Sequence, residues 1–328
     1  MFVPIRAFAG VALALGLVVA ASAAPAPVVT PVPPFTPAPG SIAVPQRSGA
    51  PESAGHRPPA VLVAPYVVPG TFAIAGARPE LTAELDVTPR GPLSDDVAIV
   101  QRRAGRIVRD YTVEMTKEIH LVVISDDWTY FRHLHPALDP EGRFTIALRF
   151  PHPGAYQVYS DTQPRGLAQQ VFRFPLVVGT GGTPVRMGLP DATGTRVAVG
   201  PYVVALGTDR LAVGHETMIP VTITRDGKPA AGLRPYLGGA AHAIVIDART
   251  LDYLHAHPIP AGPGATPAHD EQAAMGDMAA MPALAPGATI APHLVLHVRA
   301  PSAGTYKLWL QFQAPAGLEV APFVMTAG

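Results

Sequence analysis

From about residue 61, the chain alternates short apolar runs with turn-forming residues. IHLVVIS at 119–125 and QVFRFPLVV at 170–178 are two such runs, and Gly, Pro and Asp separate them from their neighbours. β-branched and aromatic residues favour strands, whereas Gly and Pro favour turns. No segment beyond residue 61 carries a sustained helical period with caps. The pattern predicts an all-β sandwich protein. Further strands are expected at 81–87, 143–150, 154–161, 202–207, 218–227, 241–247, 293–300, 305–313 and 321–327.

The two halves of this pattern repeat each other. In each half a histidine opens an apolar strand and is followed 13 and 15 residues later by a second and a third histidine, the last one preceding a proline. An aromatic residue stands two positions before each H-x-H pair. The histidines are His120, His133 and His135 in the first half and His242, His255 and His257 in the second; the aromatics are Phe131 and Tyr253. A downstream Pro-x-x-Gly-x-Tyr pattern also recurs, at 151–156 and 301–306.

This duplication predicts two tandem Ig-like β-sandwich domains, at 61–180 and 196–328, joined by a Gly/Thr/Pro-rich linker at 181–195. The second copy is longer. From its last histidine to the matched glycine is 47 residues (257 to 304), against 19 (135 to 154) in the first. The additional residues form an Ala/Gly/Pro-rich insert near 259–292, whose composition predicts flexibility.

The N-terminal 60 residues differ in composition from the rest. Arg6, an apolar run and the small residues Ala-Ser-Ala at 21–23 have the order of a secretory signal peptide, expected at 1–23. An uncleaved membrane anchor is the alternative. Proline recurs throughout 24–60, which predicts a disordered, semi-rigid linker. We therefore expect an exported protein, in the periplasm, at the cell surface or secreted, with no transmembrane segment after signal cleavage.

Composition narrows the chemistry. Of 328 residues 48% are hydrophobic, which is enough to form cores, and 24 Lys plus Arg balance 24 Asp plus Glu. A balanced charge argues against nucleic-acid binding, which needs a basic surface. The chain has no cysteine, so it has no thiol nucleophile, no Cys-ligated iron–sulfur cluster and no blue-copper site.

The repeated histidines are the candidate chemistry. Side chains two apart on a strand share a face, so His133 projects with His135, and a hairpin can bring His120 beside them. Three imidazoles suit copper or zinc and leave an open coordination position. The second copy predicts the same arrangement. Asp161 is a candidate fourth ligand in the first domain, where the second domain has Gln311.

The insert adds soft donors. His269, Met275, Met278 and Met281 lie within it, and thioether sulfur favours Cu(I). An Ala-rich insertion with incidental methionines is the alternative. With these auxiliary ligands the expected metal is copper before zinc, and the expected partners are the metal ion and another exported metal-handling protein.

Three other interpretations stay open. The histidines could only stabilise hairpins in a surface structural or interaction module, or they could form a pH switch, since imidazoles titrate near neutrality. A copper/zinc superoxide-dismutase-like enzyme also uses an H-x-H pair on a β-sandwich, but that family's usual disulfide and further histidine spacing are missing. The chain also lacks the G-x-S-x-G, HExxH and glycine-rich phosphate motifs. We therefore expect a non-catalytic protein.

The segments HLVVISDDWTYFRHLHP and RPYLGGAAHAIVIDARTLDYLHAHP resemble tandem modules of exported bacterial proteins with YLGxxxH and HxHP signatures. These modules are similar to YtkA-like domains, which are discussed with heavy-metal handling. The resemblance covers most of the chain after residue 80. It implies Ig-like sandwiches and marks the six repeated histidines as signature positions. The first domain departs from it, with VEMTKEIH in place of YLGGAAH.

Overall fold

The computed structural model describes residues 64–179, 188–189, 193–261 and 283–328. The expected signal peptide and proline-rich linker lie outside these residues, as does most of the linker at 181–195. The central part of the insert, with His269, Met275, Met278 and Met281, also lies outside them. The described residues contain no helix, and so none that is long and apolar enough to cross a membrane.

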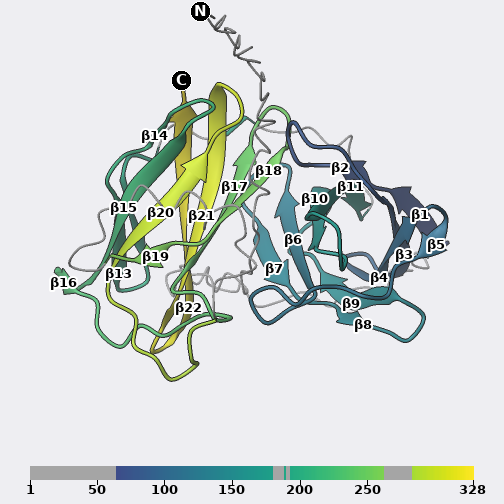
Figure 1. Ribbon diagram of the computed structural model, residues 1–328, viewed down its shortest axis with the longest axis horizontal. Coiled ribbons are helices and arrows are strands. Elements are labelled where there is room, and N and C mark those ends of the chain that lie inside the picture. Colours follow the sequence, from purple (N-terminus) through teal and green to yellow (C-terminus); the bar gives the residue numbers. More distant parts are fainter. Residues whose placement is uncertain (1–63, 180–187, 190–192, 262–282) are drawn as a thin grey trace, which may run out of the picture.

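The first domain is a sandwich of two sheets (Figure 1). Its outer sheet contains β1 (Tyr66–Pro69), β3 (Thr82–Gly91), β4 (Ser94–Arg103), β9 (Arg143–Arg149) and β8 (Ala137–Leu138) in that order, with β5 (Arg106–Ile107) pairing β4. Its inner sheet contains β2 (Thr71–Phe72), β11 (Gln170–Val178), β10 (Gly154–Thr162), β6 (Ile119–Ser125) and β7 (Phe131–Leu134). All of these pairings are antiparallel.

The second domain repeats this order. Its outer sheet contains β12 (Arg196–Val199), β13 (Tyr202–Leu206), β15 (Glu216–Arg225), β20 (His293–Arg299) and β19 (Ile259–Pro260), with β16 (Lys228–Pro229) pairing β15. Its inner sheet contains β14 (Arg210–Leu211), β22 (Gly317–Ala327), β21 (Gly304–Ala314), β17 (His242–Asp247) and β18 (Tyr253–Ala256). Only β14, which runs parallel to β22, departs from antiparallel pairing among the described strands.

The all-β, two-sandwich expectation is therefore confirmed. Every strand expected from the sequence overlaps an observed one. One long strand was missed, β4, because its first three residues, Ser94, Asp95 and Asp96, are polar. Several strands of two to four residues were also missed, β1 and β12 among them, since such short segments carry little periodicity.

The repeated Pro-x-x-Gly-x-Tyr pattern has a structural role. The Tyr156 hydroxyl donates to the carbonyl of His152 at 2.7 Å, and the Tyr306 hydroxyl donates to that of Ser302 at the same distance. The glycine two residues before each tyrosine has a φ of 150° or more, a conformation that side chains disfavour. This pattern fixes the start of β10 and of β21 and contains none of the six repeated histidines.

Burial differs between the outer and inner sheets. Outer strand β9 alternates, with Phe144 and Leu148 buried and the arginines at both ends exposed. Inner strands β6 and β17 are buried at every position. Because successive side chains of a strand point to opposite faces of the sheet, a strand that is buried at every position is covered on both faces. The outer sheet of the same domain covers one face, and the other domain covers the second.

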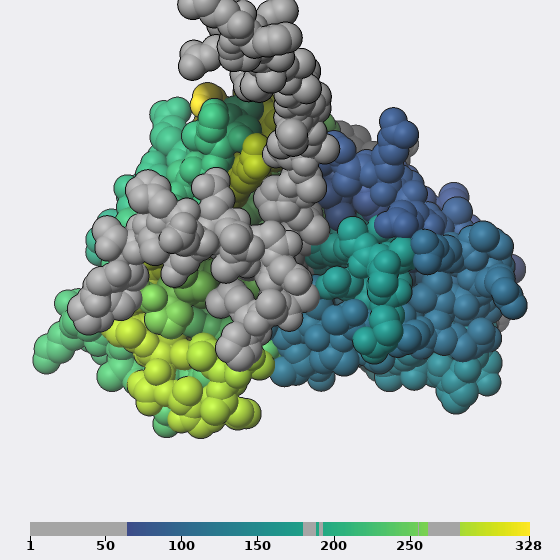
Figure 2. Space-filling view, viewed as in Figure 1, coloured from purple at the N-terminus to yellow at the C-terminus, as the bar shows by residue number. Residues whose placement is uncertain are grey.

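The inner sheets of the two domains pack against each other in the middle of the molecule, and Figure 2 shows the two domains as adjoining lobes. The backbone N–H of Tyr253 donates to the carbonyl of Ala73 at 2.9 Å, and the Tyr159 hydroxyl donates to that of Leu251 at 3.2 Å. The buried apolar residues of this interface are Ala73, Ile74, Val122, Ile124, Trp128, Phe131, Tyr159, Val171, Ile244, Ile246, Leu251, Tyr253, Trp309 and Val320.

Two aromatic stacks relate the domains by an approximate two-fold axis. Phe131 of the first domain stacks on Trp309 of the second, with ring centroids 4.4 Å apart and planes 2° apart. Tyr253, which holds the position of Phe131 in the second domain, stacks on Tyr159, which holds the position of Trp309, at 5.2 Å. The aromatic residue before each H-x-H pair thus belongs to the domain interface.

Candidate metal centre

Strand register brings the first three histidines onto one face. In the β6–β7 hairpin Val122 pairs with His133 and Leu121 with Leu134. Because neighbouring side chains on a strand alternate between faces, His120 and Val122 share a face with His133 and His135. This is the face that meets the second domain, since Val122 lies in the interface core.

The three imidazoles form a compact group. Their candidate ligand nitrogens all lie within 4.8 Å of one another, and the ring centroids are 5.1 to 5.5 Å apart. His120 and His133 are each 2% exposed, whereas His135 is partly exposed. Ligand nitrogens of a tetrahedral zinc ion, each about 2.0 Å from the metal, lie about 3.3 Å apart. The 4.8 Å limit exceeds that spacing, so the three rings have to move closer together to ligate one ion.

A backbone carbonyl sets the orientation of His120. Its Nε2 donates to the carbonyl of Glu114 at 3.2 Å. A carbonyl oxygen only accepts, so Nε2 carries the hydrogen, and the neutral ring has its lone pair on Nδ1. This Nδ1 is buried with no hydrogen-bond partner among the described residues. Metal-ligating histidines have this arrangement, in which the second ring nitrogen donates to a carbonyl or carboxylate.

The carbonyl comes from a tight turn that precedes β6. Glu114 and Lys117 exchange two backbone hydrogen bonds of 2.8 Å, and the residues between them, Met115 and Thr116, both have positive φ. Two-residue turns of this kind favour Asn and Gly, so a threonine at φ 72° is strained. The first domain therefore forms this turn without the glycines of the YLGG sequence.

The second domain repeats this geometry at its first histidine. His242 Nε2 donates to the carbonyl of Tyr236, and Tyr236 and Gly239 exchange backbone hydrogen bonds across Leu237 and Gly238, both at positive φ. His242 and His257 are 0% and 3% exposed, and their ring centroids are 5.1 Å apart. His255 pairs with Ile244, as His133 pairs with Val122; its side chain is outside the described part of the structure.

Burial keeps these imidazoles neutral. It lowers the pKa of His120 well below its usual value, and His135 and His242 act in the same direction. Burial, with Lys117 and His242 adding to it, lowers the pKa of His135 to about 3. Burial lowers the pKa of His242 to about 3 and that of His257 well below 6.5, where His242 and His120 add to the effect. Neutral imidazole is the form that ligates metals.

Asp161 lies beside the group but outside it. It pairs with His120 in the β6–β10 register, as Gln311 pairs with His242. The Gln169 amide donates to both of its carboxylate oxygens, at 2.8 and 2.9 Å. Burial raises the pKa of Asp161 well above its usual value, and Glu114 adds to the shift. The candidate fourth ligand is therefore held by an amide and is not among the three clustered residues.

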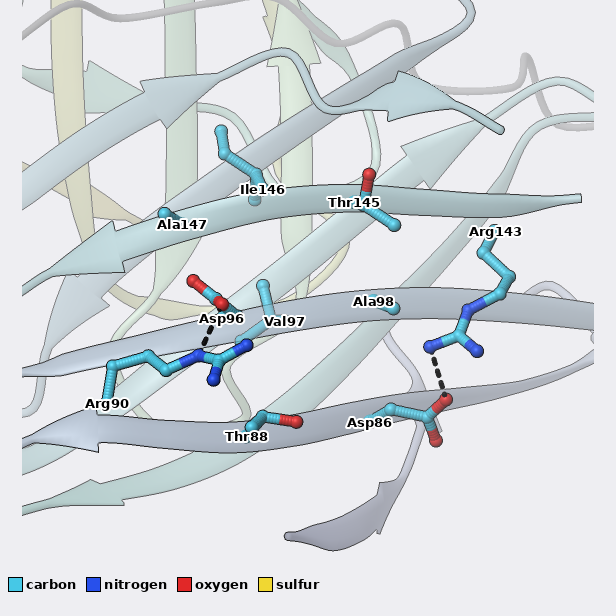
Figure 3. Close-up of a pocket in the computed structure, with 10 residues that line it drawn as sticks. All are labelled: Asp86, Thr88, Arg90, Asp96, Val97, Ala98, Arg143, Thr145, Ile146 and Ala147. Carbon is cyan, nitrogen blue, oxygen red and sulfur yellow. Dashed lines mark hydrogen bonds and ion pairs between the residues drawn. The ribbon is translucent and has the colours of Figure 1, made fainter. Parts of the chain in front are cut away.

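A charged depression of about 420 Å³ lies elsewhere, on the solvent face of the outer sheet of the first domain (Figure 3). Arg90 bonds Asp96 there at 2.5 Å, and Arg143 pairs with Asp86 at 3.4 Å. Each arginine is already paired with a carboxylate, so the depression offers no free cation to an anionic ligand.

Sequence reasoning missed the interface aromatics and the two carbonyls that orient His120 and His242. The continuous apolar runs of β6 and β17 indicated the interface, because strands buried on both faces do not alternate apolar and polar residues. The YLGG sequence indicated the orienting carbonyl, since it forms a two-residue turn at a fixed distance before the histidine.

The fold and the site together define a tandem β-sandwich protein with a buried histidine cluster at its domain interface. The chain belongs to a family described as a domain of unknown function (DUF8832), whose model matches residues 75–179 and 197–328. These stretches fall on the two sandwiches. No curated protein matches the chain.

One solved structure with some similarity is a glycosyl hydrolase family 2 member from Bacteroides cellulosilyticus. It is 10% identical to this chain and covers 81% of it, while this chain covers 28% of that protein. The TM-score of 0.18 is too low to show a shared fold.

Proposed function

We propose that this protein is an exported, non-catalytic binder of a transition metal, with copper preferred over zinc. The observation that carries the proposal is the group of His120, His133 and His135, with its ligand nitrogens within 4.8 Å of one another. Neutral, oriented imidazoles that are largely buried suit both metals. The resemblance of both H-x-H-P modules to YtkA-like domains favours the same function.

Copper is preferred because of donors outside the three-histidine group. Met275, Met278 and Met281 provide soft sulfur close in sequence to the second H-x-H pair, and sulfur favours Cu(I) over zinc. The N-terminal 23 residues support export. Binding without catalysis is proposed because the sequence carries no nucleophile, phosphate-binding or zincin motif.

Metal titration of the purified full chain tests this function. The chain is stripped with a chelator and titrated with Cu(I), supplied under ascorbate and competed against bathocuproine disulfonate, and in parallel with Cu(II) and Zn(II). Metal content is then measured by mass spectrometry. We expect tight binding of copper, weaker binding of zinc, and loss of binding in the triple variant His120→Asn/His133→Asn/His135→Asn.

Two controls separate this site from other donors. The double variant His215→Asn/His293→Asn removes two exposed histidines and should keep full binding. The variant Met275→Leu/Met278→Leu/Met281→Leu should lower copper affinity without abolishing it. A folded chain that takes up neither metal would overturn the proposal and favour a structural or interaction module with structural histidines.

A further inference from the structure

The histidine groups of the two domains face each other across the domain interface. His120 lies on the same face of the first inner sheet as Val122, and His242 on the same face of the second as Ile244; both apolar residues belong to the shared interface core. The aromatic stacks described above fix these sheets in a two-fold relation. Under that relation His120 corresponds to His242, and His135 to His257.

Electrostatic effects between the histidines of the two domains follow the same pairing. The charge of His242 lowers the pKa of His120 and of His135, and the charge of His120 lowers the pKa of His257. The two groups are therefore close enough to share one low-dielectric environment, in which charge–charge interactions are strong. His242 also has a buried Nδ1 with no hydrogen-bond partner among the described residues, as His120 does.

Charge decides how many ions such a centre can hold. Two cations side by side in a buried pocket repel each other unless anionic ligands offset them. Asp161, which pairs with His120 in the β6–β10 register, is completely buried and held by Gln169. The three ligands that the structure groups together are neutral imidazoles. Because neutral ligands offset no positive charge, the centre favours one cation over two.

We propose that the two domains build one shared metal centre, in which His242 and His257 join His120, His133 and His135 around a single ion. This inference rests on the metal binding proposed above. The bound ion links the two domains, so occupancy of the centre stabilises the domain interface. Duplication of the domain then supplies ligands from both copies to one site, instead of two independent sites.

Stoichiometry and domain-two variants test the shared centre. The full chain carrying Met275→Leu/Met278→Leu/Met281→Leu, which removes the sulfur donors of the insert, is titrated with Cu(I) as above. We expect one ion per chain. His242→Asn and His257→Asn, each made in that background, should weaken binding about ten-fold or more, although the first-domain histidines are intact. His293→Asn, on an exposed position of the second domain, is the matched control.

A variant that keeps every histidine tests the shared centre independently of any misfolding in the histidine variants. Trp309→Leu loosens the packing between the sheets and should also weaken Cu(I) binding if both domains hold the ion. Hydrogen exchange gives a second measurement. Cu(I) should slow exchange in β6 and β7 and also in β17 and β18, including the Tyr253 amide that bonds Ala73 across the interface.

The outcomes separate the two proposals. Failure of the background chain to bind any copper sinks the function itself. Binding of two ions, or one ion with unchanged affinity in His242→Asn, His257→Asn and Trp309→Leu, leaves the function standing and overturns the shared centre. Slower hydrogen exchange confined to β6 and β7 would likewise overturn the shared centre and leave the function standing.

Discussion

The buried, neutral state of His242 should make the stability of the metal-free protein depend on pH. Burial lowers its folded-state pKa to about 3, whereas an unfolded histidine titrates near 6.5. Between these values the unfolded chain binds one more proton than the folded chain. Stability is therefore full above pH 6.5 and falls as the pH is lowered toward 3.

The magnitude follows from the two pKa values. Between pH 7.5 and 5.5 the unfolded state gains about 1.4 kcal/mol from protonation of one such histidine, while the folded state gains almost nothing. Asp161 acts in the opposite direction, because burial raises its pKa. A comparison of His242→Asn with the parent chain cancels Asp161, since both proteins contain it. The stability gap between parent and variant should shrink by about 1.4 kcal/mol at pH 5.5.

Intrinsic fluorescence is a suitable assay. The chain has two tryptophans, and Trp128 and Trp309 both lie in the interface, with ring centroids 6.3 Å apart. Urea titrations at the two pH values, followed by tryptophan emission, therefore report directly on the interface. His215→Asn, at an exposed position, controls for the substitution. A gap between parent and His242→Asn that is the same at both pH values would refute the buried neutral imidazole.

Three further changes test the packing and the site. Phe131→Ala removes the ring stacked on Trp309 and should lower the free energy of unfolding by about 3–5 kcal/mol. The control Val177→Ala, at a residue 57% exposed, should change it by less than about 0.5 kcal/mol. Equal effects of the two variants in urea titrations would contradict the interface. Thr116→Gly relieves a positive φ and should raise the unfolding free energy by about 1 kcal/mol, and a loss of stability would show that the threonine is not strained. Gly239→Ala places a methyl group 2.8 Å from His242 Cε1, so it should weaken Cu(I) binding. The control Gly287→Ala, whose added methyl contacts nothing within 4 Å, should leave Cu(I) binding unchanged. Equal affinities of the two variants for Cu(I) would show that His242 is not part of the site.

The sequence by itself determined the local part of this structure. Alternation of β-branched and apolar residues with Gly and Pro predicted the strands, because strand and turn preferences are local. The two-residue period of a strand placed His133 and His135 on one face, and the 13-residue spacing allowed a hairpin to add His120. The repeat then predicted the same arrangement for His242, His255 and His257. None of these steps needs information about distant contacts.

Only the tertiary structure decided how the two copies meet. The packing of Phe131 on Trp309 and of Tyr253 on Tyr159 depends on the shapes of both inner sheets, which a local pattern does not specify. The same packing buries His120 opposite His242 and makes their imidazoles neutral, because burial and neighbouring charges are properties of the assembled interface. It also holds Asp161 on Gln169, apart from the histidine group, although its place in the register is next to His120.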